Sequence, residues 1–295
     1  MSTTPVKSVA IIGVGLIGGS AAAAWRRAGC VDRLIGAGRG WTNLERALAL
    51  GLIDEIAESP RDAAARADLV LLAVPVGATT DVLTDIVPAL SGRTVVTDAG
   101  STKTGVVADA RRILGRASAR FVPGHPVAGT EYSGADAAFA ALFENRRVIL
   151  TPDTETDPAA LSTVRGLWET AGAQVCEMTP EHHDAVLAAT SHLPHVLAYQ
   201  LVDTLAGLDE QQEIFDYAAG GFADFTRIAS SSPAMWSDIV QANRDCLLPV
   251  IDRYLAELST LRQALADNDR DAVTRRFERA KAVRDRFVDN RTGRT

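Results

Sequence analysis

The first half of the chain alternates short apolar runs with stretches of helical composition. Apolar runs typical of strands buried on both faces of a parallel sheet lie at residues 9–12, 33–37, 68–74 and 94–98. Segments predicted as helices follow or separate them at residues 19–28, 41–50, 60–66, 78–90 and 104–114. Because strands that alternate with helices form parallel sheets, this half predicts a doubly wound, mostly parallel α/β sheet.

The second half follows a different pattern, in which helices replace strands. After a predicted helix at 158–171 and a short strand at 174–176, no further strand is indicated from Pro180 onward. Helices are predicted at residues 181–206, with a candidate kink at Pro194, and at 210–229, 233–266 and 269–289. We therefore expect an α/β domain at residues 1–178 and an all-α domain at residues 179–295. Long amphipathic helices often form dimers, so a homodimer through the helical domain is expected.

A glycine motif lies between the first predicted strand and the first predicted helix. Residues 13–18, GVGLIG, follow the pattern G-x-G-x-x-G. Gly13 permits the tight turn, Gly15 lets the backbone approach a pyrophosphate, and Gly18 lets helix and strand pack closely. The N–H groups at the helix start then face the phosphates. This context favours a dinucleotide site in a Rossmann-like domain over a simple turn.

The end of the second predicted strand bears on which dinucleotide is bound. An NAD site carries Asp or Glu there for the ribose 2′-hydroxyl, whereas an NADP site has a small residue and a nearby arginine for the 2′-phosphate. Gly38 and Arg39 match the second pattern, so NADP is preferred over NAD; the alternative is that Arg39 is a solvated loop residue. The predicted cofactor contacts are Gly13, Gly15, Leu16, Ile17, Gly18, Gly38, Arg39, Val74 and Pro75.

The composition excludes several classes of function. With 47% hydrophobic residues and a net charge of −7, the 295-residue chain argues against nucleic acid or an anionic membrane as partner. Cys30, Cys176 and Cys246 lie far apart, without a CxxC pair or a Cys/His cluster, so neither a disulfide framework nor a metal site is indicated. The sequence has no apolar signal segment, and the cytoplasm is the expected location.

His125 is the leading candidate for a reactive group. It lies between Gly124 and Pro126, which predicts a shaped loop at the end of a strand. A neutral imidazole there can accept a proton near pH 7, whereas the alternative is a histidine that caps a turn. Upstream, Ser101 follows a strand end, where it caps the next helix or contacts a ligand, and Lys103 is expected at a solvated helix start.

The helical half contributes further polar candidates. His192 and His195 lie three residues apart on one face of a predicted helix, where they suit a polar substrate better than a metal, because no supporting carboxylate or cysteine is nearby. Glu181, His182 and His183 are expected to cap or solvate the start of that helix. An apolar, glycine-rich approach predicts that Arg227 points inward, to an internal partner such as Asp224 or to a carboxylate of a ligand.

Taken together, these motifs resemble the prephenate/arogenate dehydrogenase family of tyrosine biosynthesis. The similar stretches span most of the chain, and they are IIGVGLIGGS at 11–20, DAGSTKTGV at 98–106, GHPVAGTEYSG at 124–134, LFENRRVILTP at 142–152, SHLPH at 191–195 and GGFADFTRIASSSPAMWSDI at 220–239. The resemblance implies an enzyme that oxidises prephenate, or alternatively arogenate, with hydride transfer to NADP or NAD.

The resemblance also implies roles for single residues. His125 is the general base that takes the proton of the substrate's ring hydroxyl, with Ser101 hydrogen-bonded nearby. Arg227 binds a substrate carboxylate, and Glu131 guards the entrance. His192 and His195, with Ser191 of the same motif, line the substrate pocket.

Two other classes of function remain open at this stage. A β-hydroxyacid dehydrogenase shares the glycine loop and a helical second domain, but such enzymes use a lysine of the helical domain. After Lys103 the sequence holds one lysine, Lys281, near its end. A catalytically inactive sensor would bind NADP(H) without turnover.

Overall fold

The computed structural model describes the backbone of residues 6–292 and the side chains of residues 6–289. The chain forms two compact units, one that ends at Arg244 and one that begins at Asp245. Each unit is described by itself.

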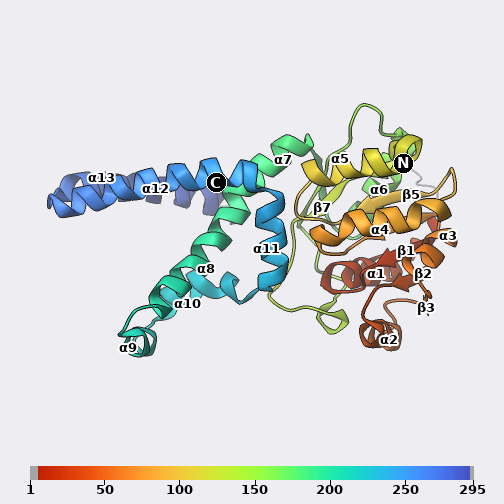
Figure 1. The fold of residues 1–295 in the computed structure, drawn as a ribbon, viewed down its shortest axis with the longest axis horizontal. Coiled ribbons are helices and arrows are strands. Elements are labelled where there is room, and N and C mark those ends of the chain that lie inside the picture. Colours follow the sequence, from red (N-terminus) through yellow and green to blue (C-terminus); the bar gives the residue numbers. More distant parts are fainter. Residues whose placement is uncertain (1–5, 293–295) are drawn as a thin grey trace. The chain divides into compact units, whose positions relative to one another are not determined.

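The first unit is built on a parallel sheet of six strands in the order β3-β2-β1-β4-β5-β6 (Figure 1). The strands are β1 Val6–Ile12, β2 Val31–Ala37, β3 Glu55–Ile56, β4 Leu69–Leu72, β5 Val95–Asp98 and β6 Phe121–Val122. The helices around them are α1 Leu16–Ala28, α2 Trp41–Ala49, α3 Pro60–Ala65, α4 Thr79–Ile86, α5 Thr104–Leu114 and α6 Pro158–Thr170. The order reverses beside β1, so the predicted doubly wound sheet is confirmed.

The side chains of β1 point alternately to the two faces of the sheet, and they belong to two separate core layers. Val9 and Ile11 pack into one cluster with side chains of α1, α2 and α6. Ala10 and Ile12 pack into a second cluster with α3, α4 and α5. Because successive side chains of a strand point to opposite faces, a continuous apolar run needs helices on both faces.

A second, three-stranded sheet carries His125. It has the order β7-β8-β9, formed by β7 Gly124–Pro126, β8 Arg147–Leu150 and β9 Gln174–Glu177. The prediction that His125 lies on a loop is wrong, because His125 pairs with Ile149 in an antiparallel ladder. Strand β7 is an edge strand, and an edge tolerates the missing N–H of Pro126.

The rest of the first unit is helical. Its helices are α7 Pro180–Leu187, α8 Leu193–Ala206, α9 Gln211–Asp216, α10 Gly220–Thr226 and α11 Pro233–Ala242. The long helix predicted at 181–206 is interrupted by one π-helical turn, Ala188–His192, just before Pro194. The helix predicted at 210–229 is two helices, and the one predicted at 233–266 is broken at Asn243, whose side chain forms tertiary hydrogen bonds.

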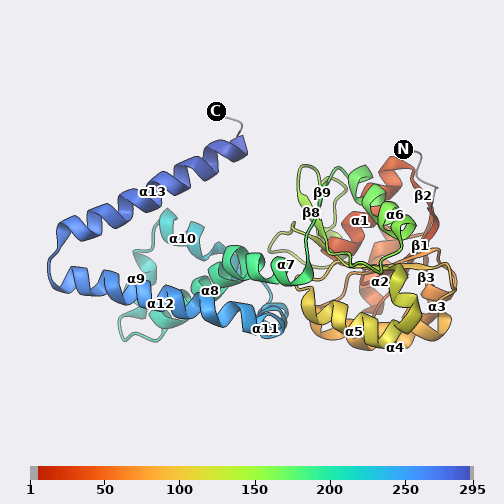
Figure 2. The ribbon, with the colours of Figure 1, turned by 90° about the horizontal axis from the view of Figure 1, so that it is seen from above.

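The second unit contains α13, Arg270–Thr292, and α12, Arg244–Ala266, apart from its first residue. The chain reverses direction between these two helices (Figure 2). An ion pair of 2.8 Å between Arg276 and Glu257 links them. Exposed apolar side chains on them are Leu248, Tyr254, Leu255, Leu258, Leu265, Phe277, Val283 and Phe287. Within residues 6–292, no helix combines the length and the apolar character that a membrane crossing requires.

Candidate active site

The carboxyl ends of three strands bring the predicted motifs to one edge of the large sheet. Ile12 of β1 pairs with Leu72 of β4, which pairs with Asp98 of β5. Neighbouring strands lie about 4.8 Å apart, so the loops that follow these three residues start within roughly 10 Å of one another. The glycine motif, the segment with Val74 and Pro75, and the turn with Ser101 therefore leave the sheet side by side.

The glycine motif has the shape that a pyrophosphate requires. A Cβ on Gly13, whose φ is +98°, would lie 2.3 Å from the carbonyl oxygen of Ala73, and one on Gly18 would lie 2.2 Å from the carbonyl oxygen of Gly13. A Cβ on Gly15 would meet none of the described atoms within 4 Å. Among residues 6–289, no side chain caps the start of α1, so its first N–H groups face this open space. The motif fits the phosphates of a dinucleotide.

The other predicted cofactor residues surround that space or lie beside it. Leu16 and Ile17 form the first turn of α1, and Val74 and Pro75 follow β4. Gly38 and Arg39 follow β2, and both are exposed. The Arg39 side chain has no hydrogen-bonded partner among residues 6–289, so it is free to meet a ligand or to remain solvated.

A buried ion pair fixes the end of β5. Lys103 is fully buried, pairs with Asp98 and donates a hydrogen bond of 2.8 Å to the carbonyl oxygen of Gly124. Asp98 also accepts from the backbone N–H groups of Gly100 and Gly124. The expectation of a solvated Lys103 is wrong, because its ammonium is needed to neutralise Asp98. The pair ties β5, α5 and β7 together beneath His125.

His125 is buried, with 8% of its surface exposed, and its Nδ1 lies 2.8 Å from Nε2 of His183. Burial is the largest influence on the ring and lowers the pKa of His125 well below 6.5. Positive charge on His183, Lys103 or His192 acts in the same direction, and Asp184 opposes it. His125 is therefore a neutral base at neutral pH, and Nε2 is its remaining nitrogen.

His183 and Asp184 are functional candidates that the sequence analysis missed. Both are buried in α7, although this helix start was expected to be solvated. The signal was periodicity: the buried residues Pro180, His183, Asp184 and Leu187 recur at i, i+3, i+4 and i+7, the pattern of one helix face. His183 Nδ1 lies 2.8 Å from Oδ1 of Asp184.

His192 and His195 have different partners. Nδ1 of His192 lies 3.0 Å from the side-chain amide nitrogen of Asn243, and its Nε2 is buried without a partner among the described residues. Burial lowers the pKa of His192 to about 4, so the ring is neutral and Nε2 is its donor. His195 donates from Nδ1 to the carbonyl oxygen of Ser191, at 2.9 Å.

Trp236 stacks on His195, with ring centroids 3.4 Å apart and 19° between the planes. Trp236 itself is half-buried. Its indole nitrogen is also buried without a partner among the described residues. Two unpaired donors, on His192 and Trp236, thus lie in one aromatic cluster with His195. Such donors suit oxygen atoms of a ligand.

Arg227 does not point into the protein as predicted. Its side chain is 61% exposed, and its partner is Glu131, at 3.5 Å, rather than Asp224. Arg227 starts a short 3-10 turn, Arg227–Ser230, at the end of α10, which directs it toward the loop after β7. Burial is the largest cause of the lowered pKa of His195, the hydrogen bond to the Ser191 carbonyl oxygen opposes the shift, and the charge of Arg227 lowers the pKa further. The Ser101 hydroxyl, by contrast, makes no hydrogen bond to the described residues, and its contact with a ligand stays a prediction.

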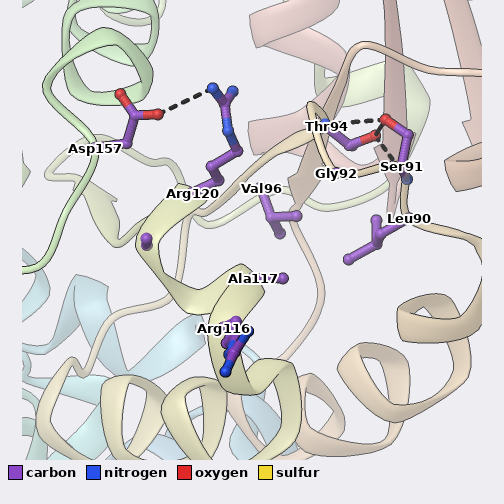
Figure 3. Close-up of a pocket in the computed structure, with 10 residues that line it drawn as sticks. Leu90, Ser91, Gly92, Thr94, Val96, Arg116, Ala117, Arg120 and Asp157 are labelled. Carbon is purple, nitrogen blue, oxygen red and sulfur yellow. Dashed lines mark hydrogen bonds and ion pairs between the residues drawn. The ribbon is translucent and has the colours of Figure 1, made fainter.

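Two hollows lie near the ends of β5. One, of about 410 Å³, is at the amino end, away from His125; Figure 3 shows the Arg120–Asp157 ion pair on one side and Ser91 with Thr94 on the other. The second, of about 350 Å³, lies among α4, α5 and α11, and Thr102 lines it beside the buried Lys103. The position of Thr102 makes the second hollow the one next to the candidate site.

Two family models match most of the chain. The model described as prephenate dehydrogenase, nucleotide-binding domain, matches residues 21–177, and the model described as prephenate dehydrogenase, dimerization domain, matches residues 179–279. The chain belongs to the prephenate dehydrogenase family. The resemblance inferred from the motifs is confirmed, and so is a Rossmann-like domain followed by a helical one.

Similar proteins include enzymes named for more than one substrate. A cyclohexadienyl dehydrogenase of Zymomonas mobilis is 43% identical over 95% of this chain and 96% of its own length. The prephenate dehydrogenase of Bacillus subtilis is 38% identical over 94% of this chain and 75% of its own length.

Solved structures agree with this assignment. A prephenate dehydrogenase of Aquifex aeolicus, in complex with hydroxyphenyl propionate and NAD+, has a TM-score of 0.90 and 36% identity, covering 97% of this chain and all of that one. An arogenate dehydrogenase of Synechocystis has a TM-score of 0.79 and 29% identity, covering 95% of this chain and 99% of that one. The family is one of dehydrogenases with a nicotinamide cofactor.

Proposed function

We propose that this protein catalyses the oxidative decarboxylation of prephenate to 4-hydroxyphenylpyruvate with hydride transfer to NADP+ or NAD+. The observation that carries the proposal is the buried His125 of β7, whose neighbour Gly124 donates a hydrogen bond to Asp98 at the sheet edge from which the glycine motif also leaves. Arogenate, oxidised to tyrosine, is the second candidate substrate, and the names of the Zymomonas and Synechocystis proteins favour keeping it.

The chemistry divides between cofactor and protein. A bound nicotinamide supplies a hydride acceptor for the carbon that bears the ring hydroxyl. His125 takes the hydroxyl proton on Nε2 while that carbon becomes a carbonyl. Loss of the ring carboxylate as carbon dioxide then aromatises the ring, and the phenolate oxygen takes the proton back from His125. No net proton is released, so a single base serves both steps.

The remaining predicted residues hold the substrate in this proposal. Arg227 binds a carboxylate of the substrate, and this ion pair replaces its 3.5 Å contact with Glu131. His195 orients the same end of the ligand from its stack on Trp236, while His192 offers its unpaired donor. Ser191 fixes His195 through its carbonyl oxygen, and Ser101 extends the set beside His125.

Replacing Arg227 by alanine is expected to raise KM for the substrate with little change in kcat. A hydrogen bond to a charged group contributes about 1.5–3 kcal/mol. That loss corresponds to a rise in KM of roughly ten- to a hundredfold. The matched control is Arg26→Ala, which removes another exposed arginine, paired with Asp54 at the far end of α1, and should leave KM unchanged. Equal KM values in the two variants would rule out the role given to Arg227.

NADP is the proposed preferred cofactor, because Gly38 leaves room for a 2′-phosphate and the exposed Arg39 can pair with it. Arg39→Ala is expected to raise KM for NADP+ about tenfold or more, the cost of one charge-assisted hydrogen bond, and to leave KM for NAD+ within about twofold. Arg33→Ala, at the other end of β2, is the control. A wild-type enzyme that prefers NAD+, or an Arg39→Ala variant without selectivity, would refute the proposal.

One experiment tests the function itself. Absorbance at 340 nm is followed with prephenate and arogenate, each with NADP+ and NAD+. Turnover of either substrate excludes the inactive sensor. The β-hydroxyacid alternative is disfavoured by Lys281, which is exposed on α13 and paired with Asp285 rather than placed at a site. Cofactor binding without turnover of either substrate would refute the proposed reaction.

Assembly and location complete the proposal. The matched dimerization domain and the exposed apolar side chains of α12 and α13 support a homodimer formed through the helical part of the chain. A domain boundary near residue 178 and a cytoplasmic location, both expected from the sequence, belong to the same proposal.

A further inference from the structure

A chain of three side chains leads from the proposed base into the protein. Nδ1 of His125 lies 2.8 Å from Nε2 of His183, and Nδ1 of His183 lies 2.8 Å from Oδ1 of Asp184. We infer that His183 and Asp184 are positioning residues that fix the tautomer of His125 and stabilise the imidazolium formed during turnover. The inference rests on the proposed function and deepens it, because it says what makes His125 a base.

The direction of these hydrogen bonds follows from Asp184. Its carboxylate accepts from the backbone N–H groups of Lys103 and Thr104, each at 2.8 Å. Burial opposes its ionisation, but hydrogen bonds from His183, Thr104 and Lys103 outweigh burial and hold the pKa of Asp184 at about 2. An ionised carboxylate only accepts, so Nδ1 of His183 carries a proton and donates.

The donor and acceptor of the Asp184 hydrogen bond also determine which nitrogen of His125 carries a proton. In this inference the His183 ring carries one proton: Nδ1 donates it to Asp184, so Nε2 is left as the acceptor. Nδ1 of His125 must then donate to it, which leaves Nε2 of His125 with its lone pair. The lone pair is the one that the proposed reaction needs, so Asp184 selects the reactive tautomer from two residues away.

The hydrogen-bonded series of His125, His183 and Asp184 is buried in the protein. His183 is fully buried, and its ring meets that of His125 edge to face, with centroids 5.0 Å apart. The side-chain amide of Asn243 donates 2.8 Å to the backbone carbonyl oxygen of Asp184, which holds α7 in place. The geometry is therefore set by packing before any ligand binds.

The same hydrogen-bonded side chains also stabilise the positive charge that forms on His125. When His125 takes a proton it becomes a buried cation, with the ammonium of Lys103 and the ring of His192 nearby. The negative charge of Asp98 is already neutralised by Lys103, so it stabilises the new charge on His125 only weakly. Asp184 is the carboxylate that favours the protonated form of His125, and it acts through the polarised ring of His183.

The test compares two replacements of His183 that differ in one property. Glutamine keeps an oxygen that can accept from Nδ1 of His125, whereas leucine offers no acceptor. We expect His183→Leu to lower kcat at least about a hundredfold, as loss of an orienting partner does, with KM for substrate and cofactor within a few fold. His183→Gln should retain kcat within about tenfold of the wild type, because the acceptor is restored. His182→Leu, an exposed neighbour on α7, is the control and should behave as the wild type.

A spectroscopic measurement separates this inference from the proposed function. Nitrogen-15 NMR of the histidine rings should find His125 protonated on Nδ1 in the wild type and in His183→Gln, and mixed in His183→Leu. Equal kcat values in the leucine and glutamine variants, whether impaired or not, would overturn the inference, as would an unchanged tautomer. A wild type without turnover on prephenate or arogenate would remove the function, while the tautomer measurement would still decide the role of His183.

Discussion

Replacement of His125 by asparagine is expected to lower kcat by about a hundred- to ten-thousandfold, the usual contribution of a general base. Asparagine can keep the hydrogen bond to His183 through its amide nitrogen, but it cannot take a proton at the position of Nε2. Steady-state kinetics with the better substrate should show the loss in kcat. KM for substrate and cofactor should stay within a few fold, because Arg227 and the glycine motif remain.

The pH dependence of the native enzyme is a second test of the proposed role of His125 as a general base. Burial holds the pKa of His125 well below 6.5, so kcat/KM should persist at pH 6.5 and fall only as the pH drops through that lower pKa. The acid limb should vanish from the residual activity of the His125→Asn variant. Near-normal turnover in that variant would show that His125 is not the base.

Replacement of Lys103 by methionine is expected to lower the free energy of unfolding by about 3–5 kcal/mol, the cost of breaking a buried ion pair from one side. Methionine fills a similar volume, but it leaves Asp98 as a buried charge with only two backbone donors. Urea unfolding followed by circular dichroism measures the loss.

Two companion variants make that stability result interpretable. Lys281→Met removes a lysine whose pair with Asp285 is exposed, and it should cost no more than about 0.5 kcal/mol. In a double variant, Asp98→Asn with Lys103→Met, much of the lost stability should return, because no charge remains buried. A Lys103→Met protein as stable as Lys281→Met would contradict the structural role of the pair.

What the sequence predicted correctly depends on local patterns. Runs such as 9–12 and 69–72 are apolar throughout, and the glycine motif has fixed spacing, so the large sheet and its dinucleotide loop could be predicted. Strand β7 could not, because three residues that include Gly124 and Pro126 carry no period. Its pairing with β8 comes from residues more than twenty positions away.

The residues of the candidate site could be picked out singly from the sequence, but the contacts between them could not. His125 and Arg227 stood out by their neighbours in sequence, yet the direction of Arg227 depends on the turn that ends α10. His183 and Lys103 were expected in solvent because a charged or polar residue at a helix start usually is. Their burial depends on partners far along the chain, such as the carbonyl oxygen of Gly124 for Lys103 and the ring of His125 for His183.

The carboxylate of Asp184 closes the amino end of α5 by accepting from Lys103 and Thr104. One side chain from the part matched by the dimerization model thereby completes a helix of the part matched by the nucleotide-binding model. A nucleotide-binding half joined to a foreign helical half would keep its glycine motif, but the start of α5 would keep its acceptor only if the foreign half placed a carboxylate at the same position.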